Sequence, residues 1–146
     1  MDKKNNIENN EKIEKIEKNN IFKNIYGKEK GIIELTLSDF IYKNKKLYIN
    51  NNFFNKKGFI IFYAPWCKHC NEISNLLLEL ADLNINIFPF GTVNSENIKD
   101  GNDYLCNYAD IIGFPTIFYI NKDNLLLKYE YDYSSDNLIY FINTNI

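Results

Sequence analysis

The hydrophobic pattern divides the chain into a polar beginning and an apolar remainder. Residues 1–30 contain 14 charged residues and seven asparagines, and their few apolar side chains are scattered among these. From Gly31 onward, short apolar runs alternate with segments of helical spacing. The pattern therefore predicts a polar, flexible extension over residues 1–30 and one folded domain over residues 31–146.

Apolar runs bounded by turn residues predict five strands. The plainest is Gly58-Phe-Ile-Ile-Phe-Tyr-Ala64, because a continuous apolar run is typical of a strand that is covered on both faces in a parallel sheet. The other predicted strands are 31–36, 85–93, 116–120 and 125–131. Residues 121–124 are expected to form the turn of a hairpin between the last two strands.

Helical spacing of apolar residues is clearest over residues 70–83. There the apolar side chains recur three and four positions apart, at Ile73, Leu76, Leu77, Leu80 and Leu83. Shorter helices are predicted over 103–108 and 134–142, and Ser38 is expected to cap another that runs through Ile41 and Tyr42. This order joins a parallel βαβ half to a β-hairpin half. It predicts an α/β fold with one central mixed β-sheet flanked by helices.

Composition and charge exclude several classes of protein. The chain is 45% hydrophobic and 25% charged, with 17 basic and 19 acidic residues, a net charge of -2 and a pI near 5.5. These values are typical of a globular protein and lack the positive surplus that binds a phosphate backbone. All the basic residues are lysines, so the chain contains no arginine. We expect a monomer that does not bind nucleic acid.

The sequence carries no evident targeting segment. No apolar stretch approaches the roughly 20 residues that span a bilayer, and the amino terminus lacks the apolar run of a signal peptide. We therefore expect no membrane span. The expected location is cytoplasmic or virion-associated, because a disulfide-forming protein in the reducing cytosol needs an unusual setting such as virus assembly.

The candidate chemistry lies in Cys67-Lys68-His69-Cys70, directly after the most apolar strand and at the start of the amphipathic helix. The free N–H groups and the positive dipole end of a helix amino terminus stabilise a thiolate, which is the attacking species in disulfide exchange. Cys67 is therefore the predicted nucleophile. Cys70, one turn further along, is expected to resolve the mixed disulfide that Cys67 forms with a substrate.

A zinc site is the main alternative for a Cys-x-x-Cys pair. Zinc needs about four ligands, and only Cys106 and His69 remain as further candidates. We therefore expect no metal and no organic cofactor, and a redox-active Cys67/Cys70 disulfide instead. Cys106 is predicted to be a packed core cysteine, with a regulatory or intermolecular disulfide as the alternative.

Two segments resemble known motifs. Phe62-Tyr-Ala-Pro-Trp-Cys-Lys-His-Cys70 is similar to the active-site segment of thioredoxin-fold proteins, and most similar to that of protein disulfide isomerase domains. Gly113-Phe-Pro-Thr116 resembles the cis-proline loop of the same proteins, and Pro115 follows Cys67 by 48 positions, as in isomerase-type domains. The resemblance covers about residues 31–142. It implies a thioredoxin fold with Pro115 beside Cys67.

The resemblance also implies a substrate-binding groove. A cis Pro115 would shape a groove edge at which backbone groups pair with an extended substrate, with Phe114 and Thr116 on either side. A trans proline that merely starts a strand is the alternative. Trp66 is solvent-facing in the resembled family and is expected to be an apolar surface for partners, whereas core filling is the alternative.

His69 is the only histidine of the chain and lies between the two cysteines. Its positive charge, with that of Lys68, is expected to favour the Cys67 thiolate and so the dithiol form. A protein whose reduced state is stabilised is a stronger oxidant, so this feature favours oxidase or isomerase activity over reductase activity.

Two departures from the resembled family concern the buried polar groups. Ile61 stands six positions before Cys67, where the family carries a buried acid that relays protons to the second cysteine. The usual lysine partner corresponds to Thr92, so both charges are replaced together. The chain also lacks the mobile arginine of isomerases. Water or His69 would then have to deprotonate Cys70, and we expect lower catalytic efficiency.

The leading hypothesis is a thiol-disulfide oxidoreductase that acts on protein cysteines. Its partners would be protein thiols and disulfides, together with an unidentified electron donor or acceptor. The alternatives are a thioredoxin-like reductase, and a thioredoxin-fold binding or structural module with little turnover.

Overall fold

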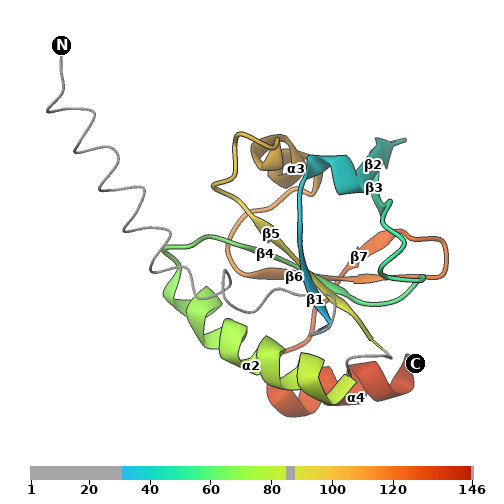
Figure 1. The fold of residues 1–146 in the computed structure, drawn as a ribbon, viewed down its shortest axis with the longest axis vertical. Helices are drawn as coiled ribbons and strands as arrows, with labels where there is room; N and C mark the ends of the chain where they lie inside the picture. The colour runs from blue at the N-terminus through green and yellow to red at the C-terminus, as the bar shows by residue number, and fades with distance from the viewer. Residues whose placement is uncertain (1–30, 85–87, 146) are drawn as a thin grey trace, which may run out of the picture.

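The computed structural model of the chain describes residues 31–84 and 88–145. The extension predicted over residues 1–30 lies outside the described residues. Within them, a five-stranded mixed sheet has helices on both faces (Figure 1). This arrangement confirms the predicted α/β fold.

The central sheet has the strand order β1-β5-β4-β6-β7. Its strands are β1 (Ile32–Leu35), β5 (Phe90–Asn94), β4 (Phe59–Tyr63), β6 (Thr116–Ile120) and β7 (Leu126–Lys128). β1, β5 and β4 are parallel, whereas β6 pairs antiparallel with both β4 and β7. The predicted combination of a parallel half and a hairpin half is therefore confirmed.

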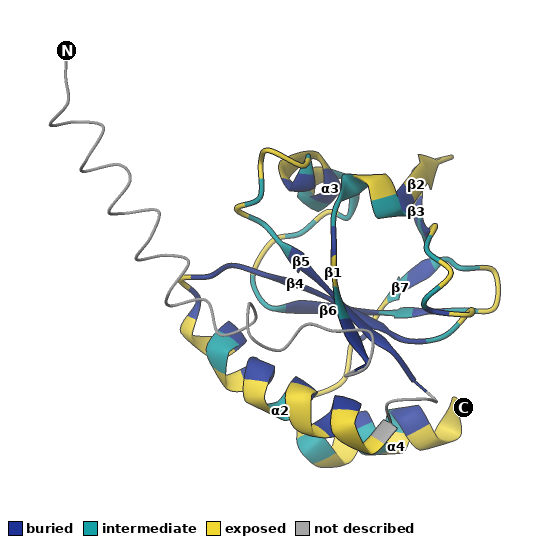
Figure 2. Ribbon diagram, in the orientation of Figure 1, coloured by how far each residue is buried: buried dark blue, intermediate teal, exposed yellow. Residues whose placement is uncertain are grey.

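Each face of the sheet has its own hydrophobic cluster. The helices α2 (Lys68–Asn84) and α4 (Ser135–Thr144) cover one face (Figure 1). The other face is covered by α3 (Asn102–Tyr108), the short 3₁₀ helix η3 (Leu37–Asp39), and a hairpin of β2 (Phe40–Lys43) and β3 (Lys46–Ile49). Figure 2 shows the buried strands enclosed between these layers.

β4 is the most enclosed strand, and all five of its residues are buried. Phe59, Ile61 and Tyr63 face the α2 side, whereas Ile60 and Phe62 belong to the cluster on the α3 side. This alternation explains the uninterrupted apolar run, because both faces of the strand exclude water. The strand therefore places the residues that follow it, including Cys67, at a rigid edge of the sheet.

The helix predicted from Ser38 through Tyr42 is wrong. Only Leu37–Asp39 form a helical turn, and Ile41 and Tyr42 lie in β2, which pairs antiparallel with β3. The turn between these strands holds Asn44 and Lys45 at φ values of 53° and 60°. Two adjacent left-handed residues favour a two-residue hairpin, and Phe40 pairs with Ile49 across it.

Other element bounds shift by a few residues. The third predicted strand begins at Phe90, not at residue 85, since Pro89 has no N–H for the ladder; residues 85–87 lie outside the described part. β7 is shorter than predicted and ends at Lys128. α4 begins after Ser134, whose hydroxyl caps it by accepting a hydrogen bond from the Asn137 N–H at 3.2 Å.

Candidate active site

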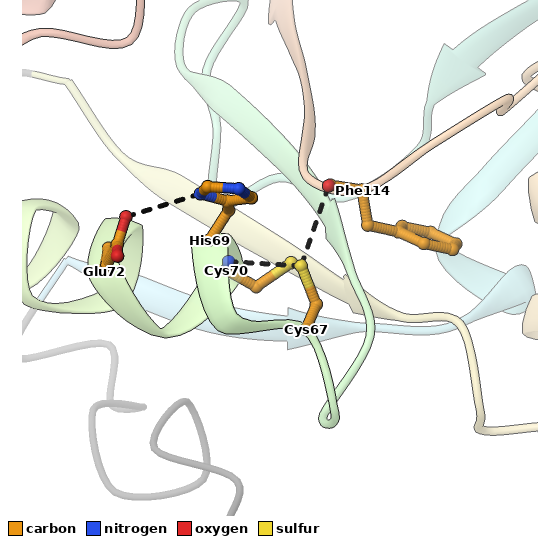
Figure 3. A network of polar contacts seen from close by, with 5 residues as sticks. All are labelled: Cys67, His69, Cys70, Glu72 and Phe114. Atoms are coloured by element: carbon orange, nitrogen blue, oxygen red, sulfur yellow. Dashed lines mark hydrogen bonds and ion pairs between the residues drawn. The ribbon is translucent and has the colours of Figure 1, made fainter.

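Cys67 occupies the cap position at the start of α2. Its sulfur accepts a hydrogen bond from the backbone N–H of Cys70 at 3.3 Å, as an N-cap side chain does (Figure 3). The same sulfur lies 3.6 Å from the carbonyl oxygen of Phe114, to which it can donate. Only 7% of Cys67 is exposed. Helix start and proline loop thus meet at this sulfur.

Cys70 lies one turn inward and is fully buried. The pKa of its thiol is raised from 9.0 to about 12, chiefly by burial and also by the hydrogen bond with the Cys67 side chain, whereas a backbone hydrogen bond with Ala64 opposes the shift. Both cysteines are free thiols in this structure. The inner sulfur therefore holds its proton far more strongly than an ordinary thiol does.

The wall of the sheet behind Cys70 is uncharged. Ile61 on β4 lies opposite Thr92 on β5, and both residues are fully buried. The register shows that these two positions neighbour each other. The acid and the lysine that the sequence comparison with the resembled family leads one to expect here are therefore replaced together by two uncharged side chains. No carboxylate at position 61 can take the proton of Cys70.

The proline loop has the predicted geometry. The peptide bond between Phe114 and Pro115 is cis, which confirms the sequence-based expectation. The hydroxyl of Thr116 donates to the carbonyl oxygen of Gly113 at 2.6 Å. Thr116 is 8% exposed, so it holds the loop together from within and its side chain is not open to solvent.

Trp66 is solvent-facing, with 67% of its surface exposed, so the core-filling alternative is wrong. Its indole N–H donates to Oε1 of Glu96 at 3.0 Å, and its ring lies edge-on to Phe114 with centroids 6.2 Å apart. The two aromatic rings thus form an apolar surface next to Cys67. Glu96 follows β5 and was not predicted, because nothing in its local sequence distinguishes it from other surface acids.

The His69 side chain is 79% exposed and points along α2. Its Nδ1 lies 3.4 Å from a carboxylate oxygen of Glu72, one turn further on (Figure 3). Among the described residues, Glu72 is its polar partner, and no hydrogen bond joins the imidazole to either sulfur. Any effect of His69 on Cys67 is therefore electrostatic, and Glu72 opposes it.

Cys106 lies on α3 and takes no part in this site. It is half-buried and packs against the cluster on the α3 face, in agreement with a packed cysteine. The pKa of its thiol is raised to about 11, chiefly by burial and to a smaller extent by the carboxylates of Asp103 and Glu96. A thiol in this setting is a poor nucleophile at neutral pH.

Residues 31–84 and 88–145 contain no group of three His, Cys, Asp or Glu side chains that could hold a metal ion. Of the helices in the same part of the chain, none combines the length and the hydropathy needed to span a bilayer.

Comparisons with known proteins agree with this geometry. The Thioredoxin family model matches residues 41–144. The chain is 31% identical over 99 residues to a protein disulfide-isomerase of Datisca glomerata, which covers 62% of this chain and 17% of that protein. It is 33% identical over 94 residues to protein disulfide-isomerase MPD1 of Saccharomyces cerevisiae, which covers 64% of this chain and 27% of that protein. The chain thus spans less than a third of the length of these relatives.

Solved structures show the same fold. The J-Trx1 fragment of ERdj5 superposes with a TM-score of 0.59 at 24% identity, covering 82% of this chain and 54% of that one. Spinach chloroplast thioredoxin f superposes with a TM-score of 0.59 at 16% identity, covering 82% of this chain and 97% of that one. Together with the two thiols, the comparisons support thiol-disulfide oxidoreductase chemistry in general.

Proposed function

The chain belongs to the thioredoxin family, and we propose that it oxidises or isomerises disulfides in protein substrates through the Cys67/Cys70 couple. The observation that carries this proposal is the position of the Cys67 sulfur. It lies between the Cys70 N–H of the helix start and the Phe114 carbonyl of the proline loop. A reactive sulfur beside the backbone of the proline loop suits an extended polypeptide substrate.

The exchange proceeds in two steps. When the protein reduces a substrate, the Cys67 thiolate attacks one sulfur of the substrate disulfide, and the other substrate sulfur leaves and takes up a proton. Cys70 then loses its proton and attacks the Cys67 sulfur, which breaks the mixed disulfide and releases the second substrate thiol. The chain is left with a Cys67–Cys70 disulfide. Oxidation of a substrate dithiol is the reverse sequence.

The charges near Cys67 support the oxidising direction. Lys68 and His69 start the same helix whose amino end faces the sulfur. Lys68, and His69 when it is protonated, add positive potential to the helix dipole. Stabilising the thiolate stabilises the reduced protein, which makes the disulfide form a stronger oxidant. An electron acceptor of the dithiol form is then needed to complete each cycle.

A binding module with little turnover is the second candidate. The pair of Ile61 and Thr92 favours it, since Cys70 is left with a pKa of about 12 and position 61 has no carboxylate to take its proton. A thioredoxin-like reductase is the third candidate, and it differs from the first in the reduction potential of the couple.

An activity assay distinguishes an enzyme from a binding module. The wild-type protein is expected to accelerate disulfide reduction in insulin with dithiothreitol as electron donor, and Cys67→Ser to abolish the acceleration, because it removes the attacking sulfur. Cys106→Ser is the matched control and is expected to keep full activity. Unchanged activity in Cys67→Ser would sink the proposal.

A further inference from the structure

We propose that Tyr133 is a positioning residue that holds the substrate-pairing edge of the proline loop in place. Tyr133 lies in the segment between β7 and α4, far along the chain from the cysteines. Its hydroxyl accepts a hydrogen bond from the backbone N–H of Ile117 at 3.3 Å and lies 3.5 Å from the carbonyl oxygen of Pro115, to which it donates. The inference rests on the proposed function.

The hydroxyl occupies a place that a strand would otherwise fill. In an antiparallel pair, the N–H and the C=O of one residue point to the same neighbouring strand. The Ile117 carbonyl oxygen accepts from the Tyr129 N–H at 2.8 Å, but its own N–H is bonded to the Tyr133 hydroxyl. β7 has ended at Lys128, so a side chain completes the edge of β6 at this point.

The Tyr133 ring is anchored by packing. It packs against the α2-side cluster, and its centroid lies 6.0 Å from that of Tyr129. The Tyr129 hydroxyl donates to the carbonyl oxygen of Asp132 at 3.3 Å, which fixes the segment just before Tyr133. Burial raises the pKa of Tyr133, so its hydroxyl keeps the proton that it donates.

The position of Pro115 matters because the residue before it contacts the reactive sulfur. Phe114 places its carbonyl oxygen 3.6 Å from the Cys67 sulfur and its ring against Trp66. Without the hydrogen bonds from the Tyr133 hydroxyl to Pro115 and Ile117, the proline loop becomes less ordered next to the Cys67 sulfur and the Trp66 ring. The disorder weakens the backbone pairing of an extended substrate more than it lowers the reactivity of Cys67 itself.

The test compares a peptide-containing substrate with one that has no peptide groups. Tyr133→Phe removes only the hydroxyl and keeps the packed ring. We expect it to raise the KM for insulin reduction by about threefold to tenfold, the effect of losing one or two hydrogen bonds, with kcat changed by less than about twofold. The rate with bis(2-hydroxyethyl) disulfide is expected to change by less than about twofold.

Tyr140→Phe is the matched control, because Tyr140 lies on α4 with 72% of its surface exposed. It is expected to leave all three quantities unchanged. An unchanged KM for insulin in Tyr133→Phe, or an equal loss of rate with both disulfides, would overturn the proposal, since the latter indicates a general structural role.

Amide hydrogen exchange separates this inference from the proposed function. Tyr133→Phe is expected to accelerate exchange of the Ile117 N–H by tenfold or more, whereas Tyr140→Phe leaves it unchanged. If the wild-type protein fails to reduce insulin, the proposed function fails, and the exchange rate alone decides whether Tyr133 holds the loop. An Ile117 N–H that exchanges equally in wild type and Tyr133→Phe contradicts the positioning role.

Discussion

The site has an outer rim (Trp66, Cys67 and Phe114) and an inner wall (Ile61, Thr92 and Cys70), which differ in chemistry although their cysteines lie one helical turn apart. At the rim, the Cys67 sulfur meets a helix N–H and a loop carbonyl, beside an exposed aromatic surface. At the wall, every residue is fully buried and uncharged. The rim combines a reactive sulfur with an exposed aromatic surface, whereas the wall keeps the second thiol protonated.

This difference separates the two steps of the exchange. Attack by Cys67 depends on the Cys70 N–H and the Phe114 carbonyl, which already face its sulfur. Resolution of the mixed disulfide depends on deprotonating Cys70, whose pKa is raised to about 12. We infer that the second step limits the rate at neutral pH. The following experiments change the wall or the rim separately.

The largest effect is expected from a charge in the wall. Ile61→Asp is expected to lower the free energy of unfolding by about 3 to 5 kcal/mol, because it leaves a buried charge without a partner. Ile61→Val, the apolar control, is expected to cost only about 1 kcal/mol. Because position 61 lies opposite Thr92, the double variant Ile61→Asp/Thr92→Lys is expected to recover part of the loss. Urea unfolding measures the free energy of unfolding of all three variants. If Ile61→Asp lowers it no more than Ile61→Val does, water reaches position 61 and the account of an apolar wall is wrong.

The next effect is a steep pH dependence of the second step. The single-turnover rate at which a mixed disulfide on Cys67 is resolved should rise about tenfold per pH unit between about pH 6 and pH 9. The reason is that burial, the main cause of the raised pKa of Cys70, persists in the mixed disulfide. A rate that levels off near pH 7 would contradict the raised pKa.

The same pKa shift predicts the sign of a stability change. The ordinary pKa of the Cys70 thiol, which applies in the unfolded chain, is 9.0, and its pKa in the folded chain is about 12. The folded state therefore binds the proton more tightly. This contribution to stability is fully present below about pH 9 and is lost as the pH rises toward about 12. Cys70→Ala is expected to flatten this part of the stability profile.

The smallest effect concerns the charges at the rim. The Cys67/Cys70 potential is expected to lie above about -230 mV, and His69→Gln should lower it by up to about 30 mV, since the thiolate loses a positive neighbour. Glu72→Gln is the control of opposite sign, because Glu72 lies 3.4 Å from the imidazole and opposes its charge. Redox titration against glutathione measures both shifts. A potential near -270 mV that neither variant moves would favour the reductase instead.

The parts of the molecule that could be predicted from sequence are those with local signals. The motif around Cys67 and Cys70, the amphipathic spacing of α2 and the apolar run of β4 each lie within a short stretch of chain. Ile61 and Thr92 were matched as replacements of one pair, and the strand register places them opposite each other.

The parts that could not be predicted depend on contacts between distant residues. The sequence predicts a helix through Ile41 and Tyr42, where β2 lies, because Ser38 is a typical cap residue and the pairing of Phe40 with Ile49 leaves no local signal. Glu96 reaches Trp66 across 30 positions, and Tyr133 reaches Pro115 across 18. In a lysine-, asparagine- and tyrosine-rich chain, neither residue stands out until the fold brings it to its partner.

Trapping the mixed disulfide tests the separate roles of the two cysteines most directly. Cys70→Ser keeps the attacking sulfur and removes the resolving one. Its Cys67 thiolate should attack a disulfide of oxidised insulin and displace one insulin thiol, so that a covalent adduct accumulates that mass spectrometry maps to Cys67. The adduct should disappear in Cys67→Ser/Cys70→Ser. An adduct that forms through Cys106, or no adduct at all in Cys70→Ser, would contradict the assignment of Cys67 as nucleophile and Cys70 as resolving thiol.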